Sequence, residues 1–242
     1  MRGNAWVHVC AWMALWGCVD TGRSYVEVPF RARGEMRAPF DVNDWSIDLS
    51  RADLAMGPLY LCATESASPE FCDAATLEML ETVTIDALDS SPRELGTLRG
   101  ITGTVRSAMW DYGMSWLGTA SRPRTNPGAP EGHSAVFSGV ATHLDGRRFE
   151  FECALDISPI MAGALVVRGR RIEAHSISDD GEMLTLVFEP RAWIRRLDFE
   201  RLATRASEGE GSVVLSPGDP DYEALVVAMT SGALPDFEWQ RQ

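Results

Sequence analysis

Strict alternation of apolar and polar residues constrains this fold most. Residues 147–157 form such a run, residues 134–144 are a second predicted strand, and Asp145-Gly146 between them is typical of a two-residue hairpin turn. Period-two alternation places the apolar side chains on one face of a strand. In the run at residues 147–157 that face consists of Phe149, Phe151, Cys153, Leu155 and Ile157. We therefore predict an antiparallel hairpin over residues 134–157.

Similar runs, separated by turn signals, fill most of the chain. Trp45, Ile47 and Leu49 alternate with polar residues, and residues 165–177 and 182–188 form a second predicted hairpin around residues 179–181. Helices are expected over residues 73–81, over residues 191–203 and after Asp219-Pro220. We predict a mainly β fold over residues 25–242: a single domain built as an antiparallel β-sandwich or barrel-like sandwich with two or three short helices.

Residues 1–17 have the three parts of a secretory signal peptide. Arg2 supplies the positive start, residues 5–16 are apolar apart from His8, and Gly17 is a small residue before a cleavage point. The apolar run is shorter than the roughly 20 residues that a transmembrane helix needs. We expect this segment to be removed, which places the protein outside the cytoplasm.

Leu15-Trp16-Gly17-Cys18 resembles the lipobox of bacterial lipoproteins. The resemblance implies that Cys18 carries acyl chains such as palmitate, that residues 18–24 are a tether, and that the lipid bilayer is a partner. Two or three acyl chains give durable attachment. Because Val19 follows the cysteine, the resemblance implies a cell-envelope protein of the outer membrane, facing the periplasm or the surface. The alternative is an ordinary secretory signal with an incidental cysteine.

The charge of the chain excludes one class of partner. It has 35 acidic and 22 basic residues, a net charge of −13. Such a chain does not bind nucleic acid by neutralising phosphates. Its net charge also predicts repulsion from anionic lipid head groups, so the acyl chains would have to supply the attachment.

Two cysteines bracket a polar loop. Cys62 and Cys72 are predicted to form a disulfide in an oxidising compartment, worth about 2–3 kcal/mol of stability for a loop of this length. The alternative is a pair of reduced thiols. Cys153 lies on the apolar face of its strand and is predicted to be a small buried core residue.

No motif of nucleophilic, phosphate-binding or zinc-protease chemistry is present. His133-Ser134 begins like GxSxG but lacks the final glycine. We therefore expect no enzyme and no cofactor, but a binding or envelope-assembly module with an unidentified protein or small-molecule partner. A hydrolase without a recognisable motif is one alternative. A carboxylate within hydrogen-bonding distance of His133 in a concave site would support it.

Histidines and a stretch rich in methionine and tryptophan provide the other alternative, a periplasmic copper or zinc protein. Imidazole suits both metals and thioether suits Cu(I). The candidate ligands are His133, His143, His175, Met109 and Met114. If exposed together, Trp110, Tyr112 and Trp116 would instead form an aromatic platform for a ligand such as a glycan.

Two longer segments carry a family resemblance. DWSIDLSRADLAMGPLYLC at residues 44–62 and FEPRAWIRRLDFERLA at residues 188–203 resemble predicted lipoproteins of unknown function in environmental bacteria. The general layout and the segment from Pro190 to Trp193 are also similar to periplasmic β-sandwich copper-binding proteins associated with methanobactin systems. The first resemblance implies no activity. The second implies copper binding, and we transfer no ligand from it.

Overall fold

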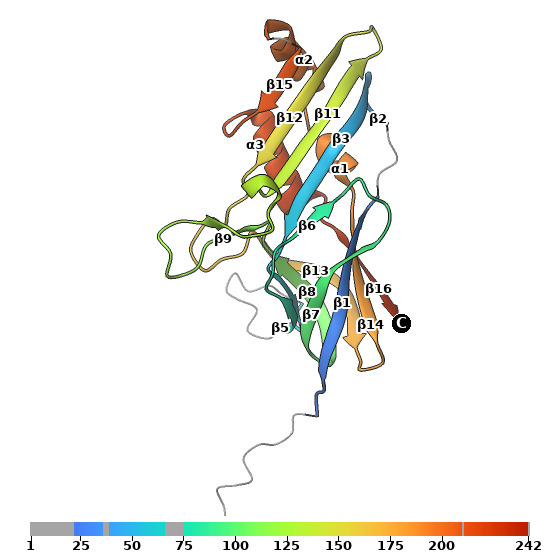
Figure 1. Cartoon of the computed structure of the whole chain (residues 1–242), viewed down its shortest axis with the longest axis vertical. Coiled ribbons are helices and arrows are strands. Elements are labelled where there is room, and N and C mark those ends of the chain that lie inside the picture. The colour runs from blue at the N-terminus through green and yellow to red at the C-terminus, as the bar shows by residue number, and fades with distance from the viewer. Residues whose placement is uncertain (1–21, 36–38, 66–74, 210, 242) are drawn as a thin grey trace, which may run out of the picture.

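The computed structural model describes residues 22–35, 39–65, 75–209 and 211–241. Within them the chain forms two large β-sheets, a small two-stranded sheet and three short α-helices (Figure 1). The first strand, β1, begins at Tyr25. The predicted fold class, a mainly β barrel-like sandwich with two or three short helices, is confirmed.

The larger sheet has eight strands in the order β13-β8-β4-β5-β7-β1-β14-β16. All its pairings are antiparallel except that of β1 with β14, which is parallel. The strands are β1 (Tyr25–Gly34), β4 (Leu59–Cys62), β5 (Ala75–Met79), β7 (Arg93–Ile101), β8 (Gly103–Trp110), β13 (Val167–Ile177), β14 (Glu182–Phe188) and β16 (Asp236–Arg241).

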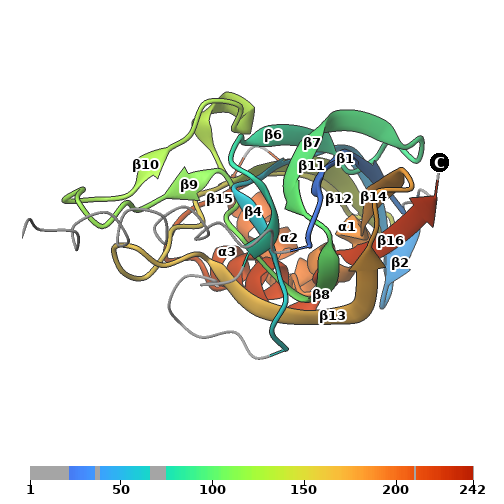
Figure 2. The ribbon, with the colours of Figure 1, turned by 90° about the horizontal axis from the view of Figure 1, so that it is seen from below.

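The two edges of this sheet come close enough to make it a nearly closed barrel (Figure 2). His175 of β13 stacks on Trp239 of β16, with ring centroids 4.3 Å apart and ring planes within 3° of parallel. The His175 ring also hydrogen bonds to the buried carboxylate of Glu182 on β14. The stacking of His175 on Trp239 joins the two edges of the sheet, which accounts for a histidine near the end of β13.

The second sheet contains the predicted hairpin. β11 (Ala135–His143) and β12 (Arg148–Leu155) pair antiparallel, with Phe137 opposite Cys153. Its order is β15-β12-β11-β3-β2, and β6 also pairs with β3; the pairing of β12 with β15 is parallel. The remaining strands are β2 (Phe40–Val42), β3 (Trp45–Met56), β6 (Val83–Asp86) and β15 (Ser212–Leu215).

Three α-helices pack against the apolar face of the second sheet, while its other face carries polar residues. They are α1 (Pro190–Ile194), α2 (Phe199–Glu208) and α3 (Pro220–Val227), and the turn η2 (Ala228–Gly232) continues α3. Phe199 of α2 lies against the rings of Trp45, Phe149 and Phe151. Trp193 of α1 is fully buried beside Phe137. The alternating strands and the helices thus share one core.

Three local predictions were wrong. Residues 73–81 were expected to be helical, but β5 forms there because Leu77 and Glu78 pair with both β4 and β7. The predicted hairpin around residues 179–181 does not form, since β13 pairs with β8 while β14 pairs with β1 and β16. The helix expected over residues 191–203 is two helices. α2 starts afresh at Asp198, whose side chain accepts a hydrogen bond from the Arg201 amide.

An arm projects sideways from the junction of the two sheets. It consists of the small sheet formed by β9 (Met114–Ser115) and β10 (Arg124–Thr125), with its connecting loop, and of the loop at residues 158–166. Both views show the two segments side by side and away from the body (Figures 1 and 2). Gly163 N–H donates to the Trp116 carbonyl over 2.7 Å and so ties them together.

Candidate functional site

The candidate site begins with a carboxylate at the base of the arm. β8 ends at Trp110, and Asp111 follows with its side chain only 1% exposed. The backbone there is held to the 57–58 segment: Asp111 N–H donates to the Pro58 carbonyl over 3.2 Å, and Gly57 N–H donates to the Asp111 carbonyl over 3.0 Å. A buried acid is held in place by its backbone at the point where the arm leaves the barrel.

Two hydrogen bonds from described residues stabilise the Asp111 carboxylate. Val166 N–H donates to Oδ1 over 2.8 Å, and the Ser115 hydroxyl donates to Oδ2 over 3.0 Å. Burial raises the pKa of Asp111 from 3.8 to about 7, against these two hydrogen bonds, which favour the ionised form. A perturbed buried acid of this kind marks a candidate functional site.

A chain of hydrogen bonds leads from Asp111 to the surface. Asn126 Nδ2 donates to Ser115 Oγ over 2.8 Å and to Thr82 Oγ1 over 3.2 Å, and the Thr82 hydroxyl donates to the Gly57 carbonyl over 3.1 Å. The Asn126 amide group is thereby fixed in orientation. Its Oδ1 accepts no hydrogen bond from the residues that the structure describes, so this oxygen remains available to a ligand.

Ser115, Asn126 and Thr82 line a pocket of about 720 Å³ between the arm and the β5–β6 connection. This volume lies within the range of small-molecule sites. Most of its other lining residues are apolar: Pro58, Tyr60, Leu80, Leu117, Ala120 and Pro127. Glu81 and Arg124 complete its charged rim. We call this cavity the arm pocket.

Gly113 gives the base of the arm its shape. Its φ of +72° lies in the left-handed region that favours glycine. A Cβ at this position would lie 2.4 Å from the Cβ of Ala55 and 3.1 Å from that of Ala129. Gly113 also accepts a hydrogen bond on its carbonyl from Asn126 N–H, over 2.8 Å. The glycine thus holds Asn126 where it faces the arm pocket.

A second pocket, of about 760 Å³, lies on the other side of the arm, between the 156–168 segment and α3. Asp156 lines it, and His133 Nδ1 lies 2.9 Å from Asp156 Oδ1. The carboxylate that would support a hydrolase is therefore present. Ser134 does not act as its nucleophile, because the side chain is buried and Oγ accepts from Ile157 N–H over 2.9 Å. Among the described residues, no hydroxyl is hydrogen bonded to His133.

The structure does not bring the three predicted histidine ligands together. His133 precedes β11 and His143 ends it, which places them roughly 30 Å apart along an extended strand. His175 lies on the other sheet, at the barrel seam. His143 contacts Asp145 over 2.8 Å, and Arg147 forms ion pairs with Asp145 and Glu200 beside it. The positive charge in that cluster is the guanidinium of Arg147, which already neutralises the two carboxylates.

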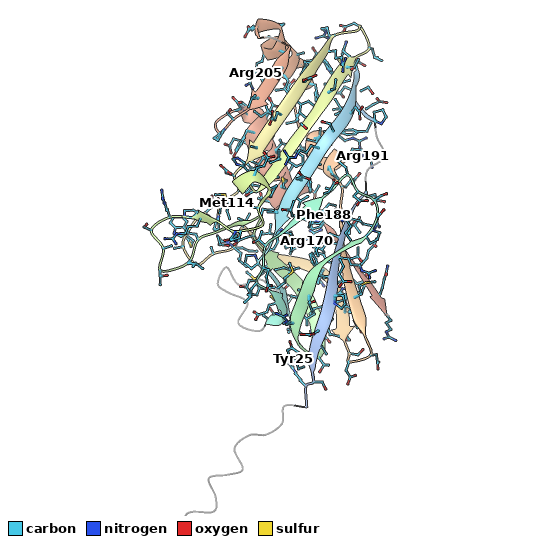
Figure 3. All side chains as sticks on the ribbon, in the orientation of Figure 1. Tyr25, Met114, Arg170, Phe188, Arg191 and Arg205 are labelled. Carbon is cyan, nitrogen blue, oxygen red and sulfur yellow. The ribbon has the colours of Figure 1, made fainter. Side chains whose placement is uncertain are left out.

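The predicted sulfur ligands are also separate from the histidines. Met109 is buried in a small cluster with Cys62 and Leu165. Met114 lies where the arm leaves the body (Figure 3), and its sulfur accepts a hydrogen bond from the Ser158 hydroxyl over 3.6 Å. Throughout the described ranges, no three His, Cys, Asp or Glu side chains are grouped to hold a metal ion.

The condition for an aromatic platform, joint exposure of Trp110, Tyr112 and Trp116, is not met. Trp110 and Tyr112 are fully buried, and the Tyr112 hydroxyl donates to the Met229 carbonyl over 2.8 Å. Trp116 is half-buried, and its Nε1 donates to the Ala120 carbonyl over 2.9 Å. Trp110 and Tyr112 pack into the core, because β8 and the bridge between Gly57 and Tyr112 close the barrel at the end of β8. The same stretch does supply the site, but through Asp111 and Ser115.

The cysteine predictions lie partly outside the described residues. Cys18 and Cys72 both fall there, so lipidation and the Cys62–Cys72 disulfide stay predictions. Cys62 is buried at the end of β4. Cys153 is a buried core residue as predicted, and burial raises the pKa of its thiol to about 12. In the part of the chain that the structure covers, no helix is long and apolar enough to cross a bilayer.

Asp111, Asn126 and Thr82 were missed by the sequence analysis. One signal was available for Asp111: it is the only charged residue in SAMWDYGMSW. An acid within such a run is either turned outward or buried with partners. Asn126 and Thr82 carry no comparable signal, since both lie in polar connections and meet only in the tertiary structure.

Comparison with known proteins leaves the family of this chain open. No family model matches it, and no curated protein does. Among solved structures, it is similar to MbnP from Methylosinus trichosporium, with a TM-score of 0.40 and 10% sequence identity over 90% of this chain and 99% of MbnP. A likeness this distant carries no argument about function, so the function has to be argued from the site itself.

Proposed function

We propose that this protein is a non-enzymatic, extracytoplasmic binding protein whose arm pocket takes a small, mainly apolar ligand with an anionic group. The observation that carries the proposal is the arm pocket itself. It combines apolar walls with one fixed amide, one arginine that forms no ion pair with any described residue, and a buried acid behind them. This is the composition of small-molecule sites: apolar surface for affinity and a few polar groups for orientation.

The apolar walls of the arm pocket indicate a surface that a ligand covers. Leu80 and Leu117 line the pocket from its two sides and are 59% and 65% exposed. An apolar patch rimmed by polar residues is typical of a ligand-binding groove or an interaction surface. A ligand with a hydrocarbon or aromatic body would cover both.

The polar groups indicate the rest of the ligand. Arg124 forms no ion pair with any described residue, so its guanidinium is available to a carboxylate or phosphate, which it can bind through two parallel hydrogen bonds. Asn126 Oδ1 would accept a hydrogen bond from a donor on the ligand. Glu81, on the rim, limits the charge of the ligand, since it repels a second anionic group placed near it.

Calorimetric titration with dodecanoate and with dodecanol tests the proposal. Dodecanoate is expected to bind more tightly, and Arg124→Gln should weaken its binding about tenfold with little effect on dodecanol. Leu117→Asp should weaken both, while Leu144→Asp, at an 84% exposed leucine on the β11–β12 turn, is the matched control. If neither probe binds, or if Leu117→Asp leaves binding unchanged, the arm pocket is not the ligand site.

We also infer that Cys18 is lipidated and holds the protein at the bacterial envelope. The support is the sequence alone. Cys18→Ser should move the protein from the membrane pellet to the soluble fraction after a high-salt wash. Mass spectrometry of the wild-type protein extracted from membranes should show the acyl chains. An unmodified Cys18, or a variant that stays in the washed pellet, would overturn this inference.

The hydrolase is kept as a second candidate because His133 and Asp156 lie together at the edge of the second pocket. Hydrolysis of p-nitrophenyl acetate that disappears in His133→Ala would establish it, and an unchanged background rate would eliminate it. The copper or zinc alternative has no such support, since the predicted ligands lie far apart. Metal analysis after reconstitution with each ion tests it directly.

A further inference from the structure

The exposed loops of the arm carry protruding apolar side chains, of which Leu117 also borders the arm pocket and Ile160 the second pocket. Leu117 on one loop and Ile160 and Met161 on the other are 65%, 80% and 55% exposed. They belong to two segments that the hydrogen bond from Gly163 N–H to the Trp116 carbonyl holds together. Four of the eight large apolar side chains that are exposed among the described residues lie here or on the pocket wall at Leu80.

The arm also differs in charge from the rest of the chain. The chain as a whole carries a net charge of −13. Yet residues 112–130 and 157–172 contain no aspartate or glutamate. They do contain arginines: Arg122, Arg124, Arg168, Arg170 and Arg171. Of these, Arg122 and Arg124 lie on the arm and form no ion pair with any described residue, and Arg168 lies at its base.

Among the residues that the structure describes, acidic groups near the arm are few and mostly engaged. Glu131 pairs with Arg51, and Glu65 pairs with Arg171. Asp156 is hydrogen bonded to His133. Glu81 and Glu223 lie on the rims of the two pockets. The tip itself, from Leu117 to Arg124 and at Ile160 and Met161, therefore combines apolar and positive side chains with no carboxylate among them.

We propose that this arm docks on a bilayer that contains anionic lipid. Its arginines complement the charge of the head groups, and its aliphatic side chains can enter the boundary between head groups and acyl chains. The shape favours a bilayer over an acidic protein. A fluid lipid surface accepts convex loop tips, whereas a protein partner would have to supply pockets for three protruding side chains. The proposal depends neither on lipidation of Cys18 nor on a ligand in the arm pocket.

Co-sedimentation with vesicles tests the proposal. The chain beginning at Val19 keeps every residue of the described fold and lacks both the leader and the cysteine that would carry lipid. We expect it to bind vesicles of phosphatidylcholine with phosphatidylglycerol, to bind phosphatidylcholine alone more weakly, and to be released by salt. Arg122→Gln should weaken binding to the anionic vesicles about fivefold, and Ile160→Asn with Met161→Gln by more.

The controls separate this surface from the arm pocket and from general charge effects. None of the arm variants changes a residue that lines the arm pocket, so dodecanoate binding should be unchanged in all of them. Arg195→Gln with Arg196→Gln, at exposed arginines between α1 and α2, should not affect vesicle binding. The proposal is overturned if wild-type protein does not bind the anionic vesicles, or if the arm variants bind like wild type. Equally tight binding to soluble polyglutamate, independent of Ile160 and Met161, would show an anion or protein surface instead.

Discussion

Asp111→Asn is expected to stabilise the protein in a strongly pH-dependent way. In the unfolded chain this carboxyl titrates near 3.8, whereas burial raises the pKa in the folded protein to about 7. Between these values the folded protein holds a proton that the unfolded chain has released. The stability that this site contributes is therefore complete below the unfolded value and is lost as the pH rises through about 7.

The magnitude follows from the two pKa values. A pKa that moves from 3.8 to about 7 corresponds to about 4 kcal/mol between the acidic and the alkaline limit. Asparagine has no charge to bury. Its amide oxygen can accept from Val166 N–H and its amide nitrogen can donate to Ser115, so both neighbouring groups keep a partner. Asp111→Asn should thus match wild type in acid and exceed it by about 4 kcal/mol in alkali.

Urea unfolding followed by tryptophan fluorescence, at about pH 5 and about pH 8, should show about 2.7 kcal/mol of this difference, because the carboxyl of the unfolded chain is already largely ionised at pH 5. Other groups titrate in the same range, but they do so equally in both proteins and cancel in the comparison. Asp180→Asn, at an exposed turn between β13 and β14, is the matched control and should show no pH-dependent difference. If Asp111→Asn changed the unfolding free energy equally at both pH values, the reasoning about a buried, desolvated carboxylate would be refuted.

Three further predictions concern the scaffold. Gly113→Ala should lower the unfolding free energy by about 1–3 kcal/mol, because its φ is +72° and the new Cβ meets a neighbouring one at 2.4 Å; unchanged urea midpoints would contradict this. Asp221→Ala should cost about 1–3 kcal/mol, since this buried carboxylate accepts from Arg201 over 2.8 Å and 3.0 Å; equal stability would show that water replaces it. Reduction should cost about 2–3 kcal/mol if Cys62 and Cys72 are joined, and a mass unchanged by reductant would argue against the bond.

The alternating runs were sufficient to predict the strands that pack on one face. The hairpin of β11 and β12, the strand β3 and the helix α3 were all predicted from local pattern and turn residues. Local pattern failed where a segment pairs with strands distant in sequence. The spacing of apolar residues in β5 is that of a helix, but the segment is a strand because β4 and β7 pair with it. β13 pairs with β8 and not with β14, its neighbour in sequence.

Composition and local sequence determined that this is a mainly β, acidic chain with a signal-like start. Only the tertiary structure decided where its charge and its polar groups come together. A net charge of −13 predicts repulsion from anionic surfaces, yet folding places on one arm Arg122 and Arg124, which form no ion pair with any described residue. Asp111, Asn126 and Thr82 meet because three connections converge at the base of that arm. Local pattern reports what each segment buries, whereas a site depends on which segments the fold brings together.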